Sequence, residues 1–146
     1  MHIGVTGPRR LTPDQEMKAT EDLIQLLTPG TTLHAGDAKG LDTLARELAV
    51  NCRLYQYDAE GWQPWQLQKR SRGMVDALVV VGGTLHAWPN KVCPLGLTID
   101  SWQGSGTWGT VRYAIAKGIR VELHPLIPEA IAPDWLELRT QQLVLW

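Results

Sequence analysis

Glycine-rich segments with polar or cationic neighbours are the parts of this chain best suited to bind an anion. The segment Gly104-Ser105-Gly106-Thr107 leads directly into a predicted helix that ends at Gly118. Such a loop exposes backbone N–H groups at a helix N-terminus, where the helix dipole also favours phosphate. This segment is therefore the first candidate ligand site.

A second candidate follows the first predicted strand, in Thr6-Gly7-Pro8-Arg9-Arg10. It combines a hydroxyl and a flexible backbone with two guanidinium groups, which are suited to bidentate contact with phosphate. The alternative is a surface turn with two solvated arginines. The candidate residues are Thr6, Gly7, Arg9 and Arg10.

A third candidate is the loop from Gly36 to Asp42. Its glycines allow a ligand to approach the backbone, and Asp42 begins a predicted helix. Asp42 either stabilises that helix start or recognises a ribose or base. For Lys39 the alternative is a solvated surface lysine. The candidate residues are Gly36, Asp37, Lys39 and Asp42.

The fourth candidate is the basic segment from Lys69 to Asp76. It is predicted to close a polar helix just before a strand, and cations at a helix C-terminus are favourable on dipole grounds alone. The functional alternative is that Arg70 or Arg72 turns back toward the ligand, and Arg72 is the candidate selected.

Groups that could catalyse a reaction are sparse. The four histidines, His2, His34, His86 and His124, do not stand beside a serine or cysteine in a recognisable motif. No group of residues has the spacing of metal ligands. The two cysteines fit neither a disulfide framework nor a zinc cluster. The sequence thus predicts no catalytic residue and no metal ligand.

Composition limits the class of protein. The chain has 146 residues, 44% of them hydrophobic, and a net charge of −1. This is the composition of one globular domain, and it argues against a general nucleic-acid binder while leaving a local basic groove open. No secretory signal or membrane span is evident, so we expect a cytoplasmic protein. Seven tryptophans, most of them in predicted loops, indicate an aromatic rim around a pocket and, with the apolar C-terminus, a homo-oligomer.

Predicted strands and helices alternate along the chain. A helix is expected to start at Thr12, with a capping box completed by Gln15. Alternation predicts an α/β fold, a doubly wound, mostly parallel sheet of five or more strands with helices on both faces and ligand loops at the carboxyl ends of the strands. The strands are expected at residues 2–6, 31–35, 53–57, 76–81 and 119–123, with a long irregular connection over 82–103 and a proline-interrupted tail over 125–146.

Four of these segments together resemble the SLOG group of Rossmann-like proteins, which includes the DNA-processing protein A, lonely-guy and molybdenum-cofactor carrier families. The similar segments begin at Ile3, His34, Lys69 and Gly104, in the group's order. The resemblance covers residues 2–124. It implies one Rossmann-like SLOG domain over residues 1–146 that binds a nucleotide or another small phosphorylated ligand as a sensor, carrier or sequestering protein.

Departures from that group bear on activity. Lonely-guy hydrolases carry a glutamate where this chain has Thr110, which argues against their hydrolytic mechanism. The alternative is a nucleotide hydrolase that uses Asp37, Asp42 or Asp100. A further alternative is a single-stranded nucleic-acid or protein-interaction module that stacks bases on its tryptophans.

Overall fold

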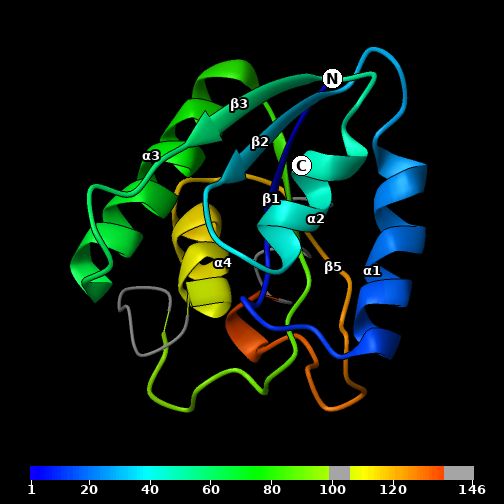
Figure 1. Cartoon of the computed structure of the whole chain (residues 1–146). Helices are drawn as coiled ribbons and strands as arrows, with labels where there is room; N and C mark the ends of the chain where they lie inside the picture. The colour runs from blue at the N-terminus through cyan, green and yellow to red at the C-terminus, as the bar shows by residue number, and fades with distance from the viewer. Residues whose placement is uncertain (99–105, 137–146) are drawn as a thin grey trace, which may run out of the picture.

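The sheet contains five parallel strands in the order β3-β2-β1-β4-β5 (Figure 1). The computed structural model describes residues 1–98 and 106–136 of the chain. Each neighbouring pair of strands is parallel, which confirms the predicted Rossmann-like α/β fold. The strands are β1 (His2–Thr6), β2 (Thr32–Gly36), β3 (Arg53–Tyr57), β4 (Thr84–Ala87) and β5 (Val121–Leu123).

Helices cover both faces of the sheet. Figure 1 shows α1 and α2 on one side of the sheet and α3 and α4 on the opposite side. Among the described residues no helix is long and apolar enough to span a bilayer. The helices are α1 (Pro13–Leu26), α2 (Leu41–Leu48), α3 (Pro64–Val81) and α4 (Gly106–Ala116).

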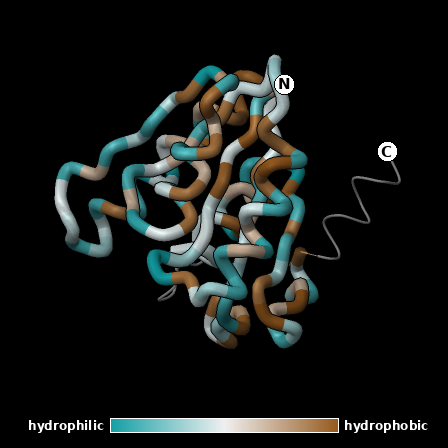
Figure 2. The backbone as a smooth tube through the Cα atoms, turned by 45° about the vertical axis from the view of Figure 1, so that its right-hand side comes forward, coloured by the Kyte–Doolittle hydropathy of each residue, from teal (hydrophilic) through white to brown (hydrophobic). Residues whose placement is uncertain are grey.

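Each face of the sheet buries its own apolar cluster. Ile3 and Val5 of β1 share a cluster with Leu23 of α1. On the other face, Leu85 of β4 shares a cluster with Leu78 of α3. Figure 2 shows hydrophobic residues recurring along the chain through the middle of the molecule. Parallel strands covered on both faces need this double core, and it fixes the sheet that carries the site.

The first helix begins as its sequence predicts. The Thr12 hydroxyl accepts the backbone N–H of Gln15, and the Gln15 side chain accepts the backbone N–H of Thr12. Pro13 occupies the first turn, where its missing N–H is not needed. This capping box satisfies two backbone donors and sets the start of α1.

The strand predicted over residues 76–81 is wrong, because these residues form the last turns of α3. Met74, Val75 and Leu78 of this helix face the core, whereas Val80 is 84% exposed. A short apolar run cannot by itself distinguish a buried strand from a buried helix. The helix ends at Gly82, which adopts the left-handed conformation (φ 69°) that favours glycine.

The long irregular connection predicted over residues 82–103 is also partly wrong, because it contains β4. Leu85 and Ala87 are fully buried, as a central parallel strand requires. The strand pairs with β1 on one side and β5 on the other. With only four residues, β4 is too short for its alternation to stand out in the sequence.

The order in which successive strands are added to the sheet reverses between β1 and β4. From β1 the chain moves outward through β2 to β3, then returns through α3 to β4 on the other side of β1. The two strands pair from Ile3 opposite Thr84 to Thr6 opposite Ala87, so their carboxyl ends lie side by side. Sheets of this kind bind ligands at such a reversal.

Candidate functional site

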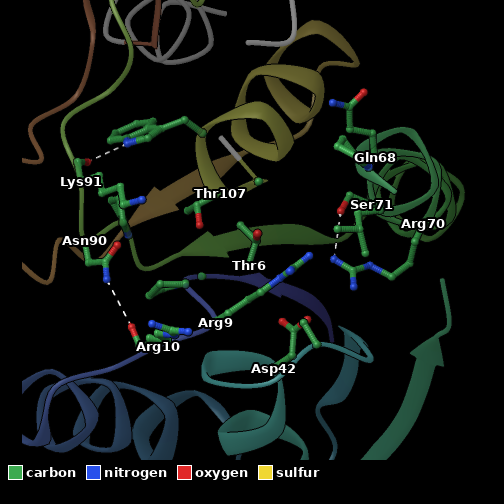
Figure 3. Close-up of a pocket in the computed structure, with 18 residues that line it drawn as sticks. Thr6, Arg9, Arg10, Asp42, Gln68, Arg70, Ser71, Asn90, Lys91 and Thr107 are labelled. Carbon is green, nitrogen blue, oxygen red and sulfur yellow. Dashed lines mark hydrogen bonds between the residues drawn. The ribbon is translucent and has the colours of Figure 1, made fainter. Parts of the chain in front are cut away.

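A cavity of about 660 Å³ lies at the carboxyl ends of β1 and β4 (Figure 3). The loops after these strands line it, together with the start of α2, the first half of α3 and the N-terminus of α4. Segments far apart in the sequence therefore meet where the sheet order reverses. The predicted site residues in its lining are Thr6, Gly7, Arg9, Arg10, Asp42, Gly106 and Thr107.

Two arginines provide positive charge to this cavity. Figure 3 shows the Arg9 side chain extending across the cavity between Thr6 and Asp42, with Arg10 at one side. The guanidinium carbon of Arg9 lies 5.8 Å from the centre of the Trp62 ring, within the range of a cation–π contact. Within residues 1–98 and 106–136, neither arginine forms an ion pair. Both remain available to an anion.

The N-terminus of α4 also reaches the cavity. The helix begins at Gly106, and both Gly106 and Thr107 belong to the lining. The first N–H groups of a helix have no partner within the helix, and the dipole there is positive. Gly104 and Ser105, the other candidates in this loop, lie outside the described residues.

Asp42 is the buried carboxyl group of the cavity. Its side chain lies in the first turn of α2, and the residue is only 6% exposed. Burial raises the pKa of Asp42 to about 6, and the positive charge of Arg70 opposes that shift. A hydrogen bond from the Ala38 backbone and the charge of Arg46 oppose it as well. A carboxyl group that titrates near neutral pH inside a cavity is a candidate for ligand recognition.

Gly36 makes room for this carboxyl group. A Cβ atom at Gly36 would come within 2.7 Å of Asp42 Oδ2 and within 3.0 Å of the Arg70 guanidinium. No larger side chain fits without moving these two charged groups. Gly36 therefore acts by its size, and it does not itself line the cavity.

Asp37 holds Arg70 in position. The Arg70 Nη1 atom lies 3.0 Å from Asp37 Oδ1, and Asp37 Oδ2 accepts the backbone N–H of Ala59 at 3.2 Å. Asp37 is absent from the lining, whereas Arg70 is part of it. The predicted candidate Asp37 therefore does not line the cavity but positions Arg70, which does.

Arg70, and not the selected Arg72, lies at the cavity. Both residues belong to α3, where a separation of two residues turns the side chain by about 200° around the helix axis. Ser71 and Gln68 share the cavity side with Arg70. The exposed Lys39 also lies away from the lining.

The sequence did not indicate the residues contributed by the segment after β4. Asn90 and Lys91 line the cavity, and the Asn90 side chain donates to the Arg10 carbonyl at 3.4 Å. The indole N–H of Trp108 donates to the Lys91 carbonyl at 2.8 Å, which fastens this segment to α4. Their signal was hidden because β4 itself was not predicted.

Of the tryptophans predicted in loops or at helix starts, two are buried and two are exposed among the described residues. Trp88 and Trp108 are buried, so they pack the core and do not form an open rim. Trp62 is exposed just before α3 and Trp65 is exposed in its first turn, next to the lining residue Pro64. Trp102 lies outside the described residues. An aromatic surface is therefore present on the α3 side of the cavity.

Thr110 has a structural place in α4. It is 1% exposed, and its hydroxyl donates to the Gly106 carbonyl at 2.7 Å. It is not among the residues that line the cavity. Of the carboxylates considered for catalysis, Asp42 lines the cavity, Asp37 does not, and Asp100 lies outside the described residues.

Solved structures with a similar fold are DNA-processing proteins. The protein from Helicobacter pylori, studied for its single-stranded DNA binding mode, aligns with a TM-score of 0.61 and 14% identity over 99% of this chain and 72% of its own. DNA-processing protein A from Streptococcus pneumoniae aligns with a TM-score of 0.61 and 18% identity over 99% of this chain and 56% of its own.

These similarities establish a fold like that of DNA-processing protein A, as the resemblance of the motifs implied. The chain spans a little over half the length of the Streptococcus pneumoniae protein. No protein-family model matches the sequence, and no curated protein matches it.

Proposed function

We propose that the chain binds single-stranded nucleic acid at the cavity between the carboxyl ends of β1 and β4. The observation that carries this proposal is the pair Arg9 and Arg10, which line the cavity without an ion-pair partner among the described residues. The N-terminus of α4 adds backbone donors from the opposite side. A phosphate of the strand is the ligand that this arrangement suits best.

Local charge matters here more than net charge. The chain as a whole carries −1, but Arg9, Arg10, Arg70 and Lys91 all line one cavity whose only lining carboxylate among the described residues is Asp42. Phosphates are attracted by the charge within roughly one Debye length, about 8–10 Å at physiological salt. The near-neutral total therefore does not oppose binding at this place.

The exposed tryptophans supply the surface on which bases could stack. Trp62 lies under the Arg9 guanidinium, and Trp65 is exposed three residues later. Stacking of a base on an aromatic side chain is worth about 1–3 kcal/mol and depends little on sequence. One phosphate site beside two indoles is a combination typical of single-strand binding.

The similar structures lend support from the fold. The Helicobacter pylori protein of this fold was studied for the way in which it binds single-stranded DNA. At 14% identity the likeness covers the fold alone, so the residues of the present cavity must carry the argument themselves.

Fluorescence anisotropy with a labelled single-stranded oligonucleotide tests this function. We expect saturable binding at low salt that weakens steeply as salt increases, because phosphate contacts release counterions. A duplex of the same sequence is the control, and we expect it to bind more weakly because its bases are not free to stack on Trp62 and Trp65. Absence of binding to single strands at low salt would refute the proposal.

A second candidate is a free nucleotide or another small phosphorylated ligand. The volume of about 660 Å³ favours it, since it lies in the range of small-molecule sites, and the buried Asp42 offers an acceptor or donor for a sugar or base. Titration with a panel of nucleotides separates the two: affinity for a mononucleotide equal to that for the oligonucleotide favours the small ligand. Turnover of a nucleotide that is lost in Asp42→Asn would favour the hydrolase instead. A cytoplasmic location and a homo-oligomer stay predictions.

A further inference from the structure

We propose that His86, Glu122 and His124 form a binding site for a divalent transition-metal ion, with Zn²⁺ as the best-suited ion. The three side chains lie on the sheet face that α1 and α2 cover, and none of them lines the cavity described above. One ligand atom from each residue lies within 4.8 Å of the other two. This inference does not depend on the proposed function.

Pairing between β4 and β5 brings these residues together. His86 of β4 stands opposite Glu122 of β5 in the sheet register. His124 lies just past the end of β5, but its backbone N–H still donates to the Ala87 carbonyl at 2.7 Å, so the alternation of side chains continues and His124 projects from the same face as Glu122. The sequence separates His86 from the other two by more than thirty positions, which is why no metal-ligand spacing was evident.

The donor atoms converge on one point. His86 Nδ1 lies 2.9 Å from His124 Nε2 and 3.5 Å from Glu122 Oε2. Three ligands at about 2.0–2.2 Å from one tetrahedral Zn²⁺ are separated by about 3.3–3.5 Å. Small side-chain movements therefore place the ion between the three atoms, in the position of the hydrogen that the two imidazoles share.

A further carboxylate, which also pairs with Lys18 at 3.1 Å, lies behind His124. Its second ring nitrogen, Nδ1, faces Asp22 Oδ2 of α1 at 3.8 Å, while Nε2 faces the proposed ion. Asp22 is itself held by the indole N–H of Trp88 at 3.0 Å, and the Trp88 ring stacks on His124 with centroids 4.6 Å apart. Histidine ligands of metals commonly have such a carboxylate behind them, which fixes the ring orientation.

The chemistry of the donors selects the ion. Two imidazoles and one carboxylate suit zinc and its neighbours in the first transition row, whereas Mg²⁺ and Ca²⁺ prefer sites built from oxygen. Glu122 is 40% exposed on the edge strand β5, so water can complete the coordination from that side. The result is a three-ligand site with an open position.

The same molecule contains a natural control. His2 Nδ1 and His34 Nε2 also lie 2.9 Å apart, on the other face of the sheet. The outer nitrogen of His34 contacts the Tyr57 hydroxyl at 2.7 Å, and no carboxylate completes a group of three there among the described residues. A pair of histidines alone should bind Zn²⁺ much more weakly than the three-ligand site.

The test is titration of untagged, metal-stripped protein with Zn²⁺ by calorimetry, and with Co²⁺ by visible absorption. We expect one ion to bind per chain, without competition from Mg²⁺ or Ca²⁺. The visible absorption spectrum of bound Co²⁺ should show the bands of a four- or five-coordinate ion. His124→Gln and Glu122→Gln should abolish binding at concentrations that saturate the unchanged protein. Asp22→Asn should weaken it about 10–100-fold. The control His2→Gln should bind like the unchanged protein.

Two results would overturn the site. One is the absence of saturable Zn²⁺ binding by the unchanged protein. The other is one-to-one binding that persists in both His124→Gln and Glu122→Gln. Circular dichroism of each variant shows whether it is folded, and the part-exposed Glu122 keeps the test valid if a histidine variant does not fold. The Zn²⁺ titration is carried out without nucleic acid. Its outcome therefore does not depend on whether the protein binds single strands.

Discussion

Arg70 Nη1 and Asp37 Oδ1 are 3.0 Å apart, and this ion pair joins α3 to the loop that follows β2. Both side chains are largely shielded from water, with 13% and 20% of their surface exposed. The pair holds the guanidinium beside Asp42, where its positive charge partly offsets the effect of burial on that carboxyl group. The geometry of the cavity thus depends on a contact between residues 33 positions apart.

Replacing Arg70 by methionine should destabilise the protein. The change leaves Asp37 without its partner and removes the positive charge that most opposes the effect of burial on the pKa of Asp42. We expect a loss of about 1–3 kcal/mol in the free energy of unfolding, less than the 3–5 kcal/mol of a fully buried pair. Urea denaturation measures it.

Lys69→Met is the matched control for this change. Lys69 pairs with Glu60 at 3.0 Å, but both side chains are exposed. Such pairs contribute at most about 1 kcal/mol. Equal losses in the two variants would contradict the role given to the Arg70–Asp37 pair.

Gly40→Ala should destabilise both the start of α2 and the Arg9 turn. Gly40 has φ 75°, and a Cβ atom there would collide with the backbone of Pro8 and Arg9. A backbone conformation of this kind alone costs a non-glycine residue about 1–3 kcal/mol. Gly30→Ala is the control, because Gly30 has φ 92° with no atom within 4 Å of the added Cβ.

The difference between these two alanine variants reports on the close approach of the two loops, because both glycines have a positive φ and only Gly40 faces another segment. We expect Gly40→Ala to lose more stability by thermal denaturation, and to bind oligonucleotide more weakly through the displaced Arg9. An equal loss of stability in both variants would mean that only the backbone conformation matters at Gly40.

Acidification should destabilise the protein partly through His34. Burial, and secondarily the neighbouring His2, lowers the pKa of His34 from 6.5 to about 4. The unfolded chain therefore binds a proton between pH 6.5 and pH 4 that the folded chain does not. The stability that neutral His34 contributes is complete above pH 6.5 and is lost as the pH falls toward 4.

Glutamine at position 34 removes this titration while keeping an amide that can bond to the Tyr57 hydroxyl. We expect the free energy of unfolding of His34→Gln to vary less between pH 6.5 and pH 4 than that of the unchanged protein. Urea denaturation at a series of pH values gives both curves. Parallel curves would show that His34 does not titrate in this window.

Local signals in the sequence predicted much of the fold. β1 and β3 begin and end at the predicted residues, and the Thr12 cap starts α1 as expected. These features depend on neighbouring residues: a strand bounded by turns, or a side chain that bonds to its own helix. The apolar run over residues 76–81 is different, because only its packing in three dimensions makes it a helix.

The candidate site follows the same division. Thr6, Gly7, Arg9 and Arg10 were found because they end or follow a correctly predicted strand. Arg72 was selected in place of Arg70 because the phase of α3 against the cavity depends on tertiary packing. The register between strands also depends on tertiary packing. For that reason the sequence did not reveal that His86, Glu122 and His124 lie together.

The most direct test of the proposed function is the salt dependence of oligonucleotide affinity in the double variant Arg9→Ala, Arg10→Ala. For single strands, each lost phosphate contact should reduce the slope of log K against log salt by about 0.7. We therefore expect a weaker and flatter dependence than in the unchanged protein, whereas the control Arg53→Ala, at the amino end of β3, should leave affinity and slope unchanged. An unchanged slope in the double variant would contradict phosphate binding at this cavity.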